Sequence, residues 1–463
     1  MKNNKIFILL PDGIGLRNFA YSDFYKLGIS NEFDVVFWNN TPFELSDLGF
    51  SEIKITNSKN NPLTDIFKNA RKQIELNLNI KKSSDLVYNT YRFPFSYKNL
   101  KSAIKSTTTR LLTKVYSSEN GLKTVRNKII SSERKTLFYK ESLATLKKES
   151  PALVFCTNQR SSSAITPIVA ARDLGIPTAT FIFSWDNLPK ATMVVETDYY
   201  FVWSEHMKSE LLHYYPYIEN ERVFVTGTPQ FETHYDSSRL MSKESFFEKY
   251  NLDSTKKYIC YSGDDVTTCP DDPEYLNDVA TAVSQLNTEG YNLGIIFRRC
   301  PVDFSNRFDA TLKKFDCIFP IAPLWKRIGD GWNTILPTNE DLDLQLNTIH
   351  HTEFVINLGS SMVFDYVTQN KSCMYINYDV KNKVIQDWSV KKIYNYIHFR
   401  SMPSKQAVVW IDSPESIKNL ILENINTNFE TIENAQLWFH KIVAQPANKS
   451  SERIWEAIKS IVK

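Results

Sequence analysis

The sequence contains no run of about 18 apolar residues, so no segment is expected to cross a membrane as a helix. Its net charge is only +3, from 55 Lys and Arg against 52 Asp and Glu, which excludes a protein that coats nucleic acid through a general positive charge. The apolar run Ile6–Leu10 is too short for the core of a secretory signal. We therefore expect a cytoplasmic protein with no nucleic-acid partner.

Several catalytic and metal-binding motifs are missing as well. The six cysteines form no CxxC and the seven histidines no HExxH, so free thiols are expected and no metal site is predicted. No Gly-x-Ser-x-Gly occurs, which leaves a serine hydrolase without support, and Gly13-Ile14-Gly15 lacks the third glycine of a dinucleotide fingerprint. Asp341-Leu342-Asp343 matches a metal-binding Asp-x-Asp, but it opens a helical pattern, where acids interact favourably with the helix dipole. No cofactor is expected.

The composition is that of a globular protein, with 42% hydrophobic, 23% charged and 13% aromatic residues. A chain of 463 residues predicts two domains or three. Short apolar runs alternate with helical patterns in both halves, which is typical of parallel sheets covered by helices on both faces. Strands are predicted at 5–10, 34–38, 52–55, 152–156, 178–183, 199–203 and 222–225, and again at 257–262, 293–297, 315–319, 334–336, 354–357, 374–377 and 408–411.

This rhythm predicts an α/β protein built of two doubly wound, Rossmann-like domains. The first spans about residues 1–235 and carries a helical insertion at about 61–150; the second spans 236–463, and its last helix could pack back on the first domain. Ligands of such sheets bind beyond the carboxyl ends of the strands, so a cleft between the two domains is the expected site.

The insertion concentrates positive charge. From Lys98 to Glu149 there are 13 Lys or Arg against 4 Glu, while the rest of the chain is net negative. Two interpretations remain open: these helices rest on an anionic membrane or guide a lipid-diphosphate acceptor, or they form an ordinary solvated insertion.

The most informative segment runs from Val355 to Asp365, where a predicted strand ends in a small-residue turn and a helix begins. The first amides of a helix point outward unpaired and favour an anion. Gly359 permits close backbone approach, and Ser360 and Ser361 add hydroxyl donors. Asp365 lies about one helical turn further on, where its carboxylate suits the two hydroxyls of a ribose. The alternative is a serine cap with a surface aspartate.

Two further segments fit the same ligand. Arg298 and Arg299 directly follow a predicted strand, and one of them could neutralise a diphosphate through paired hydrogen bonds. Gly227 and Thr228, before Pro229, form a sharp turn at the predicted domain junction and could contact the donor. A solvated strand end and a plain linker are the alternatives.

Together, these features resemble the GT-B glycosyltransferases. The resemblance rests on the two Rossmann-like halves, on Gly227-Thr228-Pro229 after Val223–Val225, and on the strand, Gly359-Ser360-Ser361 turn and helix with Asp365. Within that group the chain looks most like bacterial surface-polysaccharide enzymes, including the CDP-glycerol glycerophosphotransferases and the Kdo- and sialic-acid-transferring branches. Those cytidine-dependent branches carry a histidine before the proline where this chain has Cys300, so the nucleobase stays open.

The resemblance implies a nucleotide-sugar donor on the second domain and an oligosaccharide or lipid-linked glycan acceptor on the first, with no metal. Two aspartates are candidates for the catalytic base. Asp12, before Gly13, resembles the acidic residue–Gly motif of the sialic-acid-transferring relatives, and Asp186 also follows a predicted strand. Trp185 could stack on a sugar of the acceptor, and Arg17 could bind an acidic one.

The sequence thus predicts an inverting, metal-independent glycosyltransferase of surface-polysaccharide synthesis. Three alternatives remain: a polyol-phosphate transferase, a UDP-sugar 2-epimerase on the same fold, and a non-catalytic protein that binds a glycan or nucleotide.

Overall fold

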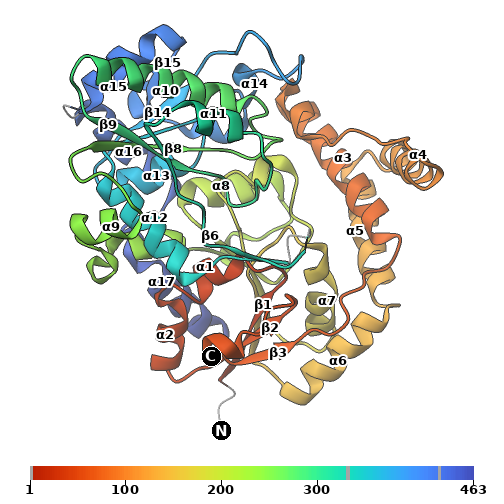
Figure 1. The fold of residues 1–463 in the computed structure, drawn as a ribbon. Coiled ribbons are helices and arrows are strands. Elements are labelled where there is room, and N and C mark those ends of the chain that lie inside the picture. The colour runs from red at the N-terminus through yellow and green to blue at the C-terminus, as the bar shows by residue number, and fades with distance from the viewer. Residues whose placement is uncertain (1–3, 330–333, 426–428) are drawn as a thin grey trace. The chain divides into compact units, whose positions relative to one another are not determined.

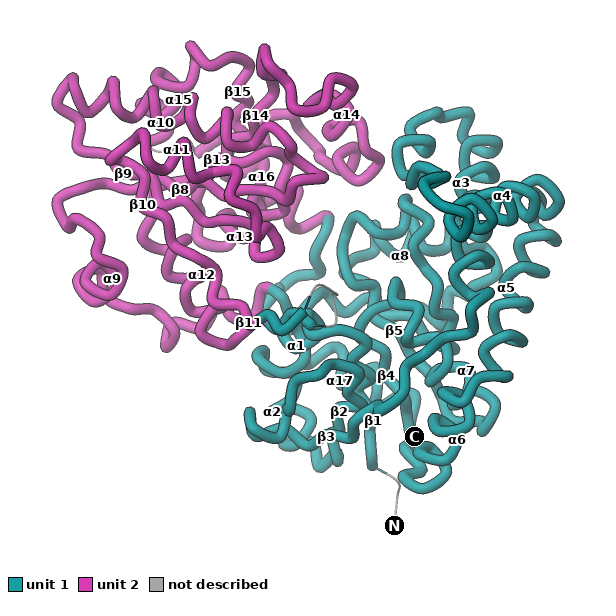
Figure 2. The backbone as a smooth tube through the Cα atoms, turned by 45° about the vertical axis from the view of Figure 1, so that its right-hand side comes forward, with its two compact units in different colours: residues 1–230, 327–336, 442–463 teal, residues 231–326, 337–441 magenta. Residues whose placement is uncertain are grey.

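The computed structural model describes residues 4–329, 334–425 and 429–463. The chain divides into two compact units, shown in Figure 2. Unit 1 contains residues 1–230, 327–336 and 442–463, and unit 2 contains residues 231–326 and 337–441. The first boundary lies near the predicted junction at residue 235, but the last segment of the chain belongs to unit 1.

Unit 1 is built on a sheet of seven parallel strands in the order β3-β2-β1-β4-β5-β6-β7. The strands are β1 (Lys5–Leu10), β2 (Asp34–Asn39), β3 (Glu52–Lys54), β4 (Leu153–Cys156), β5 (Thr178–Phe181), β6 (Tyr199–Val202) and β7 (Val223–Val225). Its helices are α1 (Gly15–Phe19), α2 (Asp23–Ser30), α3 (Thr64–Ser83), α4 (Leu100–Val115), α5 (Glu119–Glu133), α6 (Leu137–Glu149), α7 (Ile165–Asp173), α8 (Glu205–Tyr214) and α17 (Ser450–Ile461) (Figure 1).

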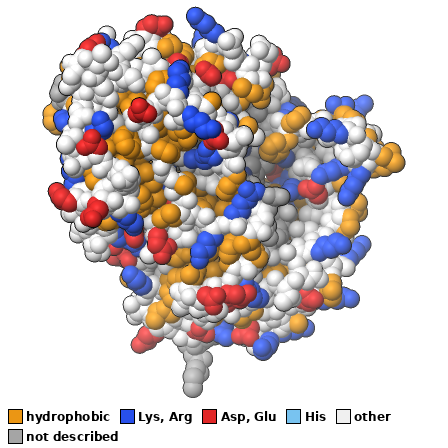
Figure 3. Space-filling view, in the orientation of Figure 1, with side chains coloured by type: hydrophobic (Ala, Val, Ile, Leu, Met, Phe, Trp, Pro, Cys, Tyr) orange, Lys and Arg blue, Asp and Glu red, His pale blue; other side chains and the backbone are white. Residues whose placement is uncertain are grey.

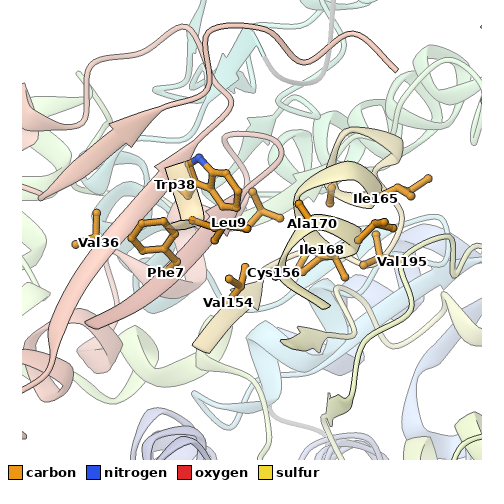
Figure 4. Close-up of a cluster of buried hydrophobic side chains, with 14 of the residues drawn as sticks. Phe7, Leu9, Val36, Trp38, Val154, Cys156, Ile165, Ile168, Ala170 and Val195 are labelled. Atoms are coloured by element: carbon orange, nitrogen blue, oxygen red, sulfur yellow. The ribbon is translucent and has the colours of Figure 1, made fainter. Parts of the chain in front are cut away.

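Alternate side chains of these strands build the two faces of the sheet. On one face, Phe7, Leu9 and Val154 pack with Ile165 and Ile168 of α7 in the buried cluster of Figure 4. Both faces are covered, which is why the strands read as continuous apolar runs rather than as alternating ones.

On the opposite face, aromatic rings connect the sheet to α1, α2 and α17. Phe19 of α1 meets Phe155 edge to face, with ring centroids 5.3 Å apart. Trp455 of α17 stacks on Phe24 of α2 at 4.9 Å and donates its indole N–H to the Phe24 carbonyl. Gly28 lies directly beneath that indole, where a Cβ atom would come within 2.3 Å of the ring. Helix α17 is therefore part of the core of unit 1.

The segment 64–149 contains the helices α3 to α6 and is attached to the rest of unit 1 by largely buried ion pairs. The guanidinium of Arg71 on α3 contacts Glu75 at 2.7 Å and Glu196 at 2.9 Å, and Arg126 on α5 holds Glu196 through two hydrogen bonds of 2.5 and 2.6 Å. Removing a carboxylate from water is unfavourable, so Glu75 and Glu196 depend on these arginines to compensate for their burial.

Unit 2 has a second parallel sheet, of six strands in the order β10-β9-β8-β13-β14-β15. The strands are β8 (Lys257–Ser262), β9 (Leu293–Arg298), β10 (Ile318–Pro320), β13 (Val355–Asn357), β14 (Cys373–Ile376) and β15 (Val409–Ile411). The helices are α9 (Lys243–Lys249), α10 (Asp272–Thr288), α11 (Asp309–Lys314), α12 (Asn339–His351), α13 (Met362–Val367), α14 (Val390–Tyr394), α15 (Ile417–Ile425) and α16 (Phe429–Ile442), the last ending one residue beyond unit 2. The predicted two-domain α/β fold with doubly wound sheets is confirmed.

Two predicted strands differ from the structure. The segment predicted at 315–319 is extended only from Ile318, and the one at 334–336 forms the two-residue strand β12 (Ile335–Leu336), which pairs with β11 (Lys326–Arg327) outside both large sheets. Apolar residues were the basis for both predictions. Ile335 and Leu336 are indeed buried, but against other parts of unit 1. The backbone of Gly13 lies close to the Ile335 carbonyl, and a Cβ on residue 13 would come within 2.2 Å of that oxygen.

Candidate functional site

The candidate donor residues lie at the carboxyl edge of the sheet in unit 2. Arg298, the last residue of β9, pairs with Ser262 of β8, and Asn357 of β13 follows a residue paired with Tyr261 of β8. Neighbouring strands of a sheet are about 4.8 Å apart, so Arg298 and the turn after Asn357 lie about 10 Å apart at the same level. The topology therefore brings the two predicted donor segments to one edge.

Arg298 is buried and held in place by Asp341 of α12. One amino group, Nη2, contacts an Asp341 carboxylate oxygen at 2.8 Å. Asp341 also accepts the backbone N–H of Leu324 at 2.8 Å and the indole N–H of Trp325 at 2.7 Å. The other amino group of Arg298, Nη1, is buried and has no hydrogen-bond partner. A buried donor left unpaired costs about 1–3 kcal/mol, and a bound anion would supply its acceptor.

Asp341 thus acts as a helix residue and as an anchor for Arg298. Thr338 caps α12 by accepting the Asp341 N–H, as the helix-start interpretation predicts. Among the residues that the structure describes, no group of three or more His, Cys, Asp or Glu side chains is placed to hold a metal ion.

The predicted turn between a strand and a helix lies at residues 358–361, between β13 and α13. Gly359 has a φ of +63°, which favours glycine, and a Cβ there would lie 3.0 Å from Phe399 and 3.2 Å from Ile393. The amide of Ser360, expected to be unpaired, instead donates to the Asn357 side chain at 2.9 Å because that asparagine reaches back across the turn. Ser361 does not cap α13, so its half-exposed hydroxyl remains available as a donor.

Asp365 points into unit 2 and is only 2% exposed. Its carboxylate lies 3.4 Å from His234 Nε2, and it accepts a hydrogen bond from the Gln345 amide at 3.3 Å. His234, in the 3₁₀ segment Pro229–Tyr235, also contacts Thr368 through Nδ1 at 3.0 Å. The predicted contact of Asp365 with a ribose stays a prediction. Sequence reasoning did not find His234, because its partner lies far along the chain and no local spacing points to it.

A pair of buried carboxyl groups follows β8. Asp272 accepts the Tyr261 hydroxyl at 2.5 Å and the Asp264 amide at 2.7 Å, and burial raises its pKa to about 6. Burial and the charge of Asp272 raise the pKa of Asp264 well above its ordinary value. With a pKa of about 6, Asp272 can donate or accept a proton near neutral pH.

A cavity of about 380 Å³ lies next to this edge. Its walls are mostly apolar or aromatic, and they come from the segments after β9 and β10: Phe297, Arg299, Cys300, Pro301, Asp303, Phe304, Leu312, Pro320, Ile321, Ala322, Pro323 and Trp325. Trp325 is joined to Arg298 through Asp341. Arg299 is among the lining residues and Arg298 is not, and walls of this kind suit a flat aromatic ring.

In unit 1, Asp12 lies just beyond β1 and is buried. One carboxylate oxygen accepts the Asn158 amide at 2.8 Å, and the other accepts the Ile14 N–H at 3.2 Å. Burial raises the pKa of Asp12 above its ordinary value, while these hydrogen bonds and the charge of Arg160 partly oppose the rise. Asn158 follows β4, the neighbour of β1, so two adjacent strand ends build this group.

The other predicted residues of unit 1 differ from Asp12 in their surroundings. Asp186 binds Lys190 and accepts the Asn187 amide at 2.8 Å, so a cation already neutralises it. Trp185 is buried, and Arg17 on α1 is half-exposed. The proposed contacts of Trp185 and Arg17 with an acceptor stay predictions.

Gly227 and Thr228 form a turn that packs on α17. Gly227 has a φ of +78°, and a Cβ there would lie 2.4 Å from the Ser450 hydroxyl. Arg453 donates to the Thr226 carbonyl at 2.9 Å. Thr228 is fully buried, and its hydroxyl accepts the Gln230 N–H at 3.4 Å. The turn thus has a structural role within unit 1, and its predicted donor contact is untested.

Unit 1 also contains a basic cavity that sequence reasoning did not single out. It measures about 240 Å³ and is lined by Lys68, Asn69, Arg71, Lys72, Phe93, Arg160, Ala191, Thr192, Met193 and Val194. Burial, together with the nearby charges of Arg160 and Lys190, lowers the pKa of Lys72 to about 8. The sequence held one indication of this cavity: Lys68, Arg71 and Lys72 are three and four residues apart, a spacing that places them on one face of a helix. The cavity is suited to an anion.

No protein-family model matches the sequence, and no curated protein sequence matches it. Solved structures with a similar fold include UDP-GlcNAc 2-epimerase from Neisseria meningitidis bound to UDP-GlcNAc, with 10% identity, a TM-score of 0.55 and coverage of 98% of this chain and 100% of that one. S. aureus MnaA with UDP has 13% identity, a TM-score of 0.51 and coverage of 99% and 96%. A glycosyltransferase from Rickettsia africae has 11% identity, a TM-score of 0.51 and full coverage of both chains, 100% each. The chain has the GT-B fold.

Proposed function

We propose that this protein is a metal-independent, inverting glycosyltransferase that moves a sugar from a nucleotide-activated donor to a glycan acceptor in surface-polysaccharide synthesis. The observation that carries the proposal is Arg298: a buried arginine at the carboxyl edge of a GT-B sheet, fixed by Asp341, with one amino group unpaired. An arginine prepared in this way suits the diphosphate of a nucleotide sugar.

In the proposed mechanism, unit 2 holds the donor. Arg298 and the Ser361 hydroxyl bind the diphosphate, and the nucleobase occupies the neighbouring cavity beside Trp325. The acceptor hydroxyl attacks the anomeric carbon and the bond to the diphosphate oxygen breaks. The positive charge of Arg298 stabilises the negative charge that develops on this leaving group.

Unit 1 supplies the base. Asp12 takes the proton of the attacking hydroxyl, and its raised pKa makes it a stronger base than an exposed aspartate. Asp186 is less suited because Lys190 neutralises it. The basic cavity with Lys68, Lys72 and Arg160 would receive a phosphate or diphosphate of the acceptor, which fits a lipid-linked glycan. Because nucleotide sugars are cytoplasmic substrates, we place the reaction on that side of the membrane.

A second candidate is a UDP-sugar 2-epimerase. The specific observation in its favour is Asp272, whose pKa of about 6 fits removal and return of a proton near neutral pH; the pKa of its neighbour Asp264 is also raised. Two of the similar solved folds are associated with UDP or UDP-GlcNAc by their descriptions.

The decisive experiment combines binding with turnover. Thermal-shift titration with UDP, CDP, CMP and GDP should show stabilisation by one of them, which identifies the donor class. With the matching nucleotide sugar and an acceptor, Asp12→Asn should abolish transfer and leave nucleotide binding unchanged, whereas the matched variant Asp186→Asn should retain both. Epimerisation without an acceptor, lost in Asp272→Asn, would favour the second candidate. If the protein binds a nucleotide but catalyses neither transfer nor epimerisation, it is a non-catalytic binding protein.

A further inference from the structure

Helix α4 is amphipathic in the reverse sense to an ordinary surface helix. Its apolar side chains Leu100, Ile104, Leu111 and Val115 are 77%, 57%, 61% and 64% exposed. Their spacing of four and seven residues places them in one stripe along the helix. A surface helix in water buries such a stripe and exposes its polar face, so the arrangement calls for a partner other than water.

The opposite, buried face of α4 is polar. Ser106 donates its hydroxyl to the Ser96 carbonyl at 2.8 Å and accepts the Ser96 N–H at 3.1 Å. Thr109, one turn further on, is 2% exposed. Asn99 and Ser102 form a capping box at the start of the helix. These contacts fix the rotation of α4 and hold the apolar stripe outward.

Positive charges border the stripe. From Arg92 to Ser118 the chain has six Lys or Arg and no Asp or Glu. Lys101 and Lys114 lie on α4 itself, and both are exposed. The preceding loop adds Phe93 and Tyr97, which are 73% and 50% exposed. Figure 3 shows basic and hydrophobic side chains together in the region where Figure 1 places α4.

We propose that α4 and the loop before it bind the surface of a membrane that contains anionic lipids. The stripe enters the boundary between headgroups and acyl chains, and the lysines contact lipid phosphates. The positive charge favours an anionic membrane over a second copy of the chain, because the same face of a second copy carries the same positive charges and would be repelled. None of the described helices is long and apolar enough to span a bilayer, so α4 lies on the membrane surface.

Vesicle sedimentation with the full chain tests this inference, which does not depend on the proposed function. The protein should sediment with vesicles rich in phosphatidylglycerol, bind less at high salt, and bind pure phosphatidylcholine weakly. The double variant Leu100→Glu, Leu111→Glu should lower the partition coefficient at least about 10-fold, since it places charge in the apolar stripe. Leu137→Glu, at a residue of α6 that is 59% exposed, is the matched control and should bind like the wild type.

A second measurement separates insertion from loss of fold. All variants should keep the circular dichroism and urea midpoint of the wild type, because every substituted side chain is exposed. A fluorophore on Leu111→Cys should shift to shorter wavelength with anionic vesicles, and one on Leu137→Cys should not. Equal partition of wild type and double variant would overturn the proposal. The proposal would also be overturned if the wild type were a dimer that binds no vesicles and the double variant were a monomer.

Discussion

Arg298→Gln tests the donor site through both stability and binding. The side chains of Arg298 and Asp341 are 7% and 4% exposed, so the substitution leaves a buried carboxylate without its cation. Breaking such a pair costs about 3–5 kcal/mol. Asp341 keeps the N–H groups of Leu324 and Trp325, which places the expected loss near the lower end of that range. The effect on binding is separate: loss of a hydrogen bond from a charged donor to the diphosphate removes about 1.5–3 kcal/mol of binding free energy, a factor of about 10 to 150 in affinity.

Urea unfolding and isothermal titration with the nucleoside diphosphate measure the two effects. For the unfolding measurement alone, Arg299→Gln is the matched control, because that neighbouring arginine donates to the Ser305 carbonyl and lies over the Phe308 ring. It should change the free energy of unfolding by less than about 1 kcal/mol. The reasoning is refuted if Arg298→Gln binds the nucleotide as tightly as the wild type.

Two further predictions concern unit 1. Trp455→Ala should lower the free energy of unfolding by about 3–5 kcal/mol, because the indole is buried against Phe24 and Phe33; a change below 1 kcal/mol or so in urea unfolding would contradict its place in the core. The pKa of Lys72 is lowered to about 8, so between pH 8 and the ordinary pKa of 10.5 the folded state binds fewer protons than the unfolded state. The contribution of Lys72 to the free energy of unfolding therefore increases as the pH rises through this range. Pyrophosphate should bind the basic cavity more weakly above about pH 8, because Lys72 loses its positive charge there. Titrations below and above pH 8 should show this difference in affinity for the wild type and not for Lys72→Met. If the affinity of the variant depends on pH as that of the wild type does, another group causes the effect.

The strands of the sheets could be predicted from the sequence because the local pattern determines them. The run at Lys5–Leu10 coincides with β1, and Lys257–Ser262 coincides with β8. Each is a short apolar stretch between turns, which is what a strand covered on both faces requires. The start of α12 at Asn339 was predictable to within two residues for the same reason, since Thr338 and the acids after it form a local capping pattern.

The candidate site was less accessible, because its contacts join segments far apart in the chain. The Asp341 carboxylate anchors Arg298, and Asp365 meets His234; no spacing encodes either pair. The Ser360 amide illustrates the limit at short range: the sequence predicted the turn but not the rotamer of Asn357, which takes up that amide. Burial of α4 on its polar side was equally invisible, since a helical pattern alone does not say which face packs inward.

The membership of residues 442–463 in unit 1 has a consequence for how the protein is made. A ribosome releases residues 1–230 first, yet the indole that lies over Gly28 arrives only after the whole of unit 2 has been synthesised. Until then one aromatic face of the first sheet lacks its helix, and the nascent chain exposes Phe24 and Phe33. Maturation of this unit is thus coupled to completion of translation, and a gene fragment ending at the first boundary encodes a domain without its closing helix.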